Sequence, residues 1–216
     1  MKREILDALR AARRGRSSLA LTTELNTGAQ TLEPAGQAKT GVEAIGNSEI
    51  FTHVFEPAPR LILVGAVHIA QKLVPLARLA EFTVHVVDPR GAFASVERFP
   101  DVDLSLDWPD KAVAGLSPDS ATAVVTLTHD PKLDDPGLIA ALRSPAFYVG
   151  ALGSRKTHGR RVERLRAEGF GDTEIARIHA PVGLPIGGIS PGEIAVSIMA
   201  EIIAVRRGRR LEAAGA

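Results

Sequence analysis

The chain has 216 residues, of which 45% are hydrophobic and 24% charged, and its formal net charge is +1. A chain of this length buries roughly 70% of the surface that its unfolded form exposes, which predicts one medium-sized globular domain with a small appendage. The near-neutral charge gives no support for a nucleic-acid-binding surface, and the basic cluster RRGRR near the C-terminus is interpreted as a solvent-exposed helix end.

Two absences narrow the classes of protein further. No apolar run reaches the ~18 residues that a membrane span needs, and residues 1–15 lack the apolar core of a signal peptide, so a cytoplasmic protein is expected. The sequence contains no cysteine. This excludes disulfides, thiolate metal sites and a persulfide carried on this chain.

The first 59 residues predict a small α+β subdomain. Residues 1–14 have the apolar spacing of an amphipathic helix, and a strand is expected in the segment SSLALTTELNTG. Residues 35–48 are small and glycine-rich, which predicts an exposed loop, and the alternating segment EIFTHVFEP predicts a second strand. The prolines at positions 57 and 59 mark the expected domain junction.

From residue 60 to residue 210, apolar strands alternate with helices, and residues 211–216 are expected to be a tail. The pattern predicts a doubly wound, Rossmann-like α/β fold with strand order 3-2-1-4-5-6. The expected strands are LILVG, TVHVVD, VDLSL, TAVVTLT, FYVGAL and IHAP, and the expected helices lie near residues 68–80, 109–116, 136–143, 155–168 and 191–207. The last helix begins with a capping box, formed by Ser190 and Glu193 around Pro191.

The turn after the first of these strands resembles a dinucleotide-binding turn with a changed phosphate clamp. Gly65 occupies the position of the tight turn, and Ala70 replaces the third glycine of the usual pattern. Val67 stands at the second position, where a side chain would separate the backbone from a phosphate. Asp88 ends the next strand, 23 residues after Gly65, where an acid could receive a ribose hydroxyl; Arg90 could instead meet a phosphate.

The segment LTHDPKLDDP follows the fourth strand, beside the first strand at the switch point of the sheet. Thr128, His129 and Asp130 are therefore expected opposite Val67 and His68, where they could hold a polar heterocycle. Asp134 or Asp135 with Pro136 predicts a capped helix start. The spacing of His68 and His129 does not match a metal site, so no metal is expected.

A second ligand-binding segment is predicted in GALGSRKTHGRR. Gly153 and Ser154 turn the chain into a helix whose free backbone N–H groups favour an anion. Arg155 and Lys156 lie in the first turn, where cations are unfavourable to the helix itself, so a phosphate is expected to compensate them. Arg160 and Arg161 are expected to face solvent.

Five segments together resemble the XdhC family, the accessory proteins of xanthine dehydrogenase, aerobic carbon monoxide dehydrogenase and related molybdenum hydroxylases. The resemblance covers residues 55–208 and implies a non-catalytic protein that binds molybdenum cofactor, as molybdopterin or its cytosine dinucleotide, and delivers it to the apo-enzyme. Family members also assist insertion of the sulfido ligand together with a cysteine desulfurase. The segments are GAVHIAQ, VVDPRGAFASVERFP, LTHDPKLDDP, FYVGALGSRKTHGRRVERL and IHAPVGLPIGGISPGEIAVSIMAEIIAVRRG.

The first 55 residues depart from this family pattern. Longer members carry a Gly-Ser-Ser-Pro-Arg-like and a Gly-Gly-Cys-x-Glu-like segment there, and neither is present. Either a second XdhC-like chain supplies the missing region, or this chain retains only the half that handles the cofactor. The last helix is apolar on more than one face, so it either seals the sheet or meets a second subunit, and a homodimer is expected. Neither a nucleic acid nor a membrane is expected as a partner.

Two other functions stay open: an NAD(P)-dependent oxidoreductase and a nucleotide-sensing Rossmann domain. The oxidoreductase is suggested only by analogy of fold, and a fold by itself is weak evidence for a function. The single tyrosine, Tyr148, has Leu152 rather than lysine four residues later, so the sequence lacks a Tyr-x-x-x-Lys pair.

Overall fold

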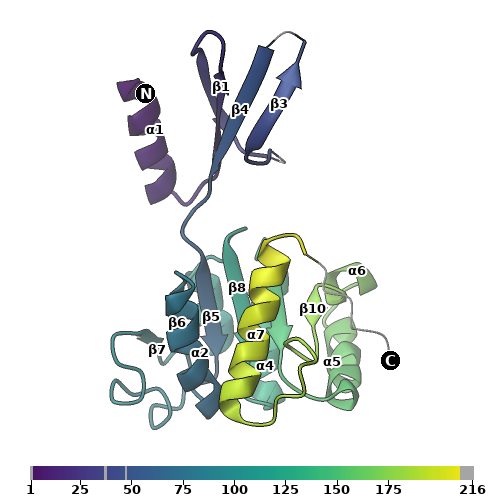
Figure 1. Ribbon diagram of the computed structural model, residues 1–216. Helices are drawn as coiled ribbons and strands as arrows, with labels where there is room; N and C mark the ends of the chain where they lie inside the picture. The colour runs from purple at the N-terminus through teal and green to yellow at the C-terminus, as the bar shows by residue number, and fades with distance from the viewer. Residues whose placement is uncertain (1, 37, 47, 210–216) are drawn as a thin grey trace. The chain divides into compact units, whose positions relative to one another are not determined.

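The computed structural model describes residues 2–36, 38–46 and 48–209 (Figure 1). The chain divides into two compact units, Met1–Ala58 and Pro59–Ala216. The predicted tail, residues 211–216, lies outside the described residues. None of the described helices has the length and apolar character required to cross a bilayer.

The N-terminal unit contains a helix and an antiparallel sheet with strand order β2-β1-β4-β3. One expectation is corrected, because residues 35–48, predicted as a loop, contain strand β3. Every side chain of β3 is exposed, so it has no buried face to produce an alternating hydrophobic pattern; its pairing with β4 defines it. The elements are α1 (Arg3–Arg14), β1 (Leu19–Glu24), β2 (Gln30–Pro34), β3 (Gly41–Ile45) and β4 (Ser48–Phe55).

The C-terminal unit confirms the predicted doubly wound sheet. Its six strands are parallel and run in the order β10-β9-β8-β5-β6-β7; numbered within the unit and read from β7 to β10, this is 3-2-1-4-5-6. The elements are β5 (Arg60–Val64), α2 (His68–Leu79), β6 (Thr83–Val87), β7 (Asp103–Ser105), α3 (Pro109–Gly115), β8 (Thr122–Thr126), α4 (Pro131–Leu142), β9 (Tyr148–Ala151), α5 (Arg155–Ala167), α6 (Asp172–Ile175), β10 (Ile178–His179) and α7 (Pro191–Arg206).

Helices cover both faces of this sheet, because its central strands are apolar on both sides. On one face α2 and α7 lie side by side and pack on the strands through residues such as Leu73 and Ile198 (Figure 1). On the other face α3, α4 and α5 bury Val113, Leu138 and Leu165. The carboxyl ends of β5, β6, β8 and β9 therefore share one edge of the sheet, and the predicted ligand-binding segments follow these ends.

Two helix starts were predicted from capping signals, and one is correct. The capping box of α7 forms as expected: Glu193 N donates to Ser190 Oγ at 3.3 Å, and Ser190 N donates to Glu193 Oε2 at 2.8 Å. The predicted start of α4 at Asp134–Pro136 is wrong, because α4 begins at Pro131 with Asp130 as its N-cap. Asp130 with Pro131 also fits a capped helix start, and Asp134 is buried inside the helix instead of capping it.

Two glycines inside helices are expected to respond differently to replacement by alanine. Gly159 in α5 has open space around its missing side chain, so Gly159→Ala should stabilise the protein by up to about 1 kcal/mol through helix propensity. At Gly137 in α4 a methyl group would approach Val64 Cγ2 to 3.1 Å, and this crowding should cancel the gain. Urea denaturation of both variants measures the difference; a Gly137→Ala protein as stable as Gly159→Ala would contradict it.

Candidate functional site

Gly65 brings the loop after β5 against the loop after β8. Its φ is +112°, a conformation that glycine adopts without strain, and its N–H donates to Val87 O at 2.8 Å. A methyl group on Gly65 would lie 2.5 Å from Thr128 Cγ2. The glycine thus permits close approach of Thr128, and these two loops meet at the switch point as the strand order predicts.

Val67 and His68 begin helix α2. Val67 is the N-cap residue, its side chain cannot accept a hydrogen bond, and it packs partly buried against the core. The first turn of α2 contains no acidic residue, and the side chain of His68 is exposed. The first N–H groups of this helix consequently have no side-chain cap.

Asp88 is fully buried and accepts four hydrogen bonds. The donors are Ala66 N at 2.8 Å, Arg90 N at 3.0 Å, and Arg90 Nε and Nη2 at 2.9 and 2.8 Å. Burial by itself would raise the pKa of Asp88, but the bonds from Arg90 and Ala66 outweigh it and lower the pKa. A carboxylate has about four acceptor positions, so Asp88 is saturated within the chain and fixes the turn after β5.

Asp134, which the sequence predicts only as a possible helix cap, organises the loop after β8. Its buried carboxylate accepts from Thr128 N at 3.1 Å, Thr128 Oγ1 at 2.7 Å and His129 N at 3.1 Å. Asp130 is the N-cap and accepts from Lys132 N at 2.9 Å. The side chain of His129 is exposed, and its φ of +61° belongs to this constrained loop.

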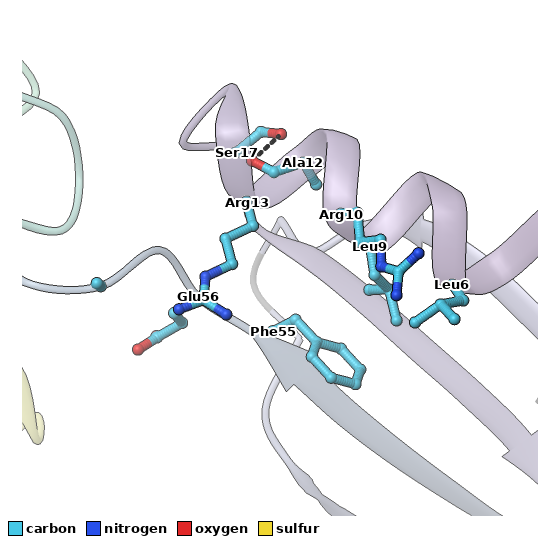
Figure 2. Close-up of a pocket in the computed structure, with 9 residues that line it drawn as sticks. Leu6, Leu9, Arg10, Ala12, Arg13, Ser17, Phe55 and Glu56 are labelled. Carbon is cyan, nitrogen blue, oxygen red and sulfur yellow. Dashed lines mark hydrogen bonds between the residues drawn. The ribbon is translucent and has the colours of Figure 1, made fainter.

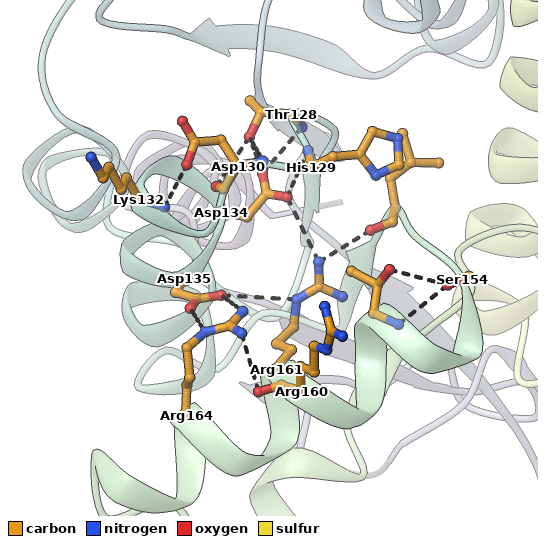
Figure 3. A network of polar contacts seen from close by, with 12 residues as sticks. Thr128, His129, Asp130, Lys132, Asp134, Asp135, Ser154, Arg160, Arg161 and Arg164 are labelled. Carbon is orange, nitrogen blue, oxygen red and sulfur yellow. Dashed lines mark hydrogen bonds and ion pairs between the residues drawn. The ribbon is translucent and has the colours of Figure 1, made fainter.

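The prediction that Arg161 faces solvent is wrong, because the residue is only 2% exposed. Its Nη2 donates to Leu152 O at 3.1 Å and lies 3.7 Å from Asp134, while Nε lies 4.0 Å from Asp135. Figure 3 shows its guanidinium between the carboxylates of α4 and the first turn of α5. The sequence contains a signal for this burial, because Arg161 lies four residues before the apolar Leu165, which is buried, on the same helix face. Arg160 is exposed, as predicted.

The first turn of α5 is capped but leaves two cations without partners. Ser154 Oγ accepts from Thr157 N at 3.2 Å, and Gly153 has a φ of +135° before it. Arg155 and Lys156 are exposed, and their side chains make no hydrogen bond or ion pair with any residue that the structure describes. This pair of free cations lies where the sequence predicts an anion.

The described residues hold no group of three or more potential metal ligands. A separate groove of about 530 Å³ lies in the N-terminal unit, between α1 and the end of β4 (Figure 2). Leu6, Leu9 and Phe55 make it largely apolar, and none of the predicted site residues lines it.

Comparisons with known proteins agree with this fold. The family model of the XdhC Rossmann domain matches residues 61–202. The molybdenum cofactor insertion chaperone PaoD of Escherichia coli K12 is 32% identical over 170 residues, which are 79% of this chain and 46% of the relative. A relative from Bacillus subtilis strain 168, named as a probable xanthine dehydrogenase subunit, is 35% identical over 164 residues, or 74% of this chain and 47% of the relative.

A solved structure described as a xanthine dehydrogenase from Bacillus halodurans matches with a TM-score of 0.69 and 26% identity. That match covers 99% of this chain and 66% of the other. The chain spans less than half the length of the two curated relatives above.

Proposed function

The chain belongs to the XdhC family, and we propose that it binds molybdenum cofactor and helps to insert it into an apo molybdenum hydroxylase of the xanthine or carbon monoxide dehydrogenase type. The cofactor is carried as cargo, as molybdopterin or its cytosine dinucleotide, and the chain performs no reaction on it. The relative named as a molybdenum cofactor insertion chaperone supports this function.

The saturated carboxylate of Asp88 is the observation that favours this proposal over an NAD(P)-dependent oxidoreductase. A dinucleotide held in the usual way needs a free acceptor at that position for its ribose hydroxyl. Here Arg90 and Ala66 occupy the acceptor positions. Tyr148 is also engaged, since its buried hydroxyl donates to Glu201.

The proposed cofactor site lies along the carboxyl edge of the sheet. The anionic part of the cofactor is assigned to the first turn of α5, with Arg155 and Lys156, and its heterocycle to the loops at the switch point. Asp88 and Arg90 shape the turn behind them. The complete set is Gly65, Val67, His68, Asp88, Arg90, Thr128, His129, Asp130, Gly153, Ser154, Arg155 and Lys156.

The proposed partners are the apo-hydroxylase, a cysteine desulfurase, a second XdhC-like chain and a second copy of this chain. The homodimer rests on α7: Ile198 and Ile202 are buried, whereas Val196 and Ile203 are 48% and 40% exposed. Residues seven positions apart lie on one helix face, so these two form an apolar stripe. A groove of about 520 Å³ lies beside it, lined by residues of α2 and of the start of α7.

Titrations with purified molybdenum cofactor and with NADH test the function. We expect the cofactor to bind, NADH to fail, and the variant Arg155→Gln/Lys156→Gln to lose about tenfold or more in cofactor affinity through lost charge-assisted contacts. Arg160→Gln, an exposed change on the same helix, is the control. Saturable NADH binding without cofactor binding would instead favour the oxidoreductase or the nucleotide sensor.

A further inference from the structure

Four buried side-chain atoms lack a hydrogen-bond partner within the described part of the chain, and they come from three residues. They are Thr126 Oγ1, His158 Nδ1, and Nε and Nη1 of Arg161. Buried polar atoms are almost always paired, so several unpaired atoms in one region mark a place where something else supplies the partner. We call Thr126, His158 and Arg161 the Arg161 cluster.

Thr126 ends β8, whereas His158 and Arg161 lie about one turn apart on α5. Leu152 joins two of them, because its N–H donates to Thr126 O at 2.9 Å and its carbonyl accepts from Arg161 Nη2 at 3.1 Å. The register partners of Thr126 are Val64 and Ala151, whose side chains lie in the core beneath α3, α4 and α5. The side chain of Thr126 therefore faces the helices that carry Asp134 and Arg161.

The neighbouring carboxylates are already occupied by other donors. Asp134 accepts from Thr128 and His129, and Asp135 accepts from Nη2 of Arg164 at 3.1 Å. At 3.7 and 4.0 Å these carboxylates balance the charge of Arg161 without accepting its N–H groups. The guanidinium thus keeps unused donors in a desolvated place.

A hydrogen-bond acceptor with several oxygen atoms would pair the unpaired donors of the Arg161 cluster. Arginine offers only donors, and its fork matches phosphate and carboxylate oxygens. The hydroxyl of Thr126 can add a donor. Burial, and then the nearby charge of Arg161, lower the pKa of His158, so its neutral ring can donate or accept. The exposed cations Arg155 and Lys156 stand on the first turn of the same helix.

We propose that the Arg161 cluster is the inner end of a phosphoryl-binding subsite, which receives a phosphate group through the first turn of α5. The inference deepens the proposed function, because it assigns this subsite to the phosphate of the cofactor. The unpaired atoms of the cluster are covered, so binding displaces part of the first turn of α5. That turn begins with exposed residues after Gly153, and the side chain of Arg161 reaches back to Leu152 O, just before the turn.

Inorganic phosphate and pyrophosphate are the probes for a calorimetric titration of the full chain. We expect both to bind, and Arg161→Lys, which keeps the charge but loses the fork, to weaken binding about 10- to 100-fold. Arg160→Lys makes the same chemical change at an exposed neighbour and should bind like the wild type. Thr126→Val should also weaken binding, because it removes the hydroxyl and keeps the shape.

Hydrogen exchange on the wild-type chain gives a second measurement, which holds even if Arg161→Lys fails to fold. Phosphate should change the exchange of the amides in residues 152–162, because binding displaces the first turn of α5. No binding by the wild type, or equal binding by wild type and Arg161→Lys, contradicts the subsite; a change of exchange confined to other segments does the same.

A parallel titration with purified molybdenum cofactor separates the two proposals. Equal cofactor binding by wild type and Arg161→Lys would contradict the subsite and still support the proposed function. Phosphate binding that depends on Arg161, without any cofactor binding, would support the subsite and refute the function.

Discussion

Replacement of Asp134 by alanine is expected to lower the free energy of unfolding by about 3–5 kcal/mol. The change removes the acceptor of three hydrogen bonds from Thr128 and His129 and the carboxylate nearest to Arg161. Burial raises the pKa of Asp134 despite the hydrogen bonds from Thr128, so its charge is costly to bury. The expected loss therefore comes from the buried partners that are left unsatisfied.

A matched control is the exposed pair of Asp172 and Arg166, whose carboxylate and guanidinium lie 2.9 Å apart. Asp172→Ala should cost at most about 1 kcal/mol, because solvent screens an exposed ion pair. Urea denaturation at neutral pH compares the two variants. Similar losses at Asp134 and Asp172 would show that the Asp134 network contributes little, and the Arg161 cluster would then lose its structural support.

The strand order of the C-terminal unit was predictable because it depends on features that a sequence displays directly. LILVG and TAVVTLT are continuous apolar runs, as expected of strands buried on both faces. Helical segments between such runs require parallel crossovers, which leaves few topologies. Strand β3 gives no such signal, since its side chains are exposed and its backbone partners come from β4.

The sequence predicted where the candidate site residues lie in the fold, but not the contacts that they make. The segments expected to bind a ligand follow the carboxyl ends of four strands, which the fold alone dictates. Whether the Asp88 carboxylate can accept a hydrogen bond from a ligand depends on the side chain of Arg90, two residues later. That side chain folds back and donates two hydrogen bonds to the carboxylate. Asp134 and Arg161 were misassigned because cap and surface patterns treat charged residues as solvated, whereas tertiary packing buried both.

Replacement of Gly65 by alanine is expected to cost about 3 kcal/mol or more, from two separable causes. A φ of +112° strains any residue with a side chain, and the new methyl group would lie 2.5 Å from Thr128 Cγ2. Gly91→Ala is the control, because Gly91 has open space around it and no positive φ. Its stability should stay within about 0.5 kcal/mol of the wild type.

Thr128→Ser separates the two causes, because serine lacks the methyl group that clashes but keeps the hydroxyl bonded to Asp134. Alone, this substitution should cost about 1 kcal/mol for the lost methyl group. Combined with Gly65→Ala, it should restore part of the stability, so that the double variant loses about 1–2 kcal/mol less than the sum of the single variants. Urea denaturation of the four proteins completes the cycle. Strict additivity would mean that backbone strain alone accounts for the loss and that the methyl group of Thr128 does not require the glycine.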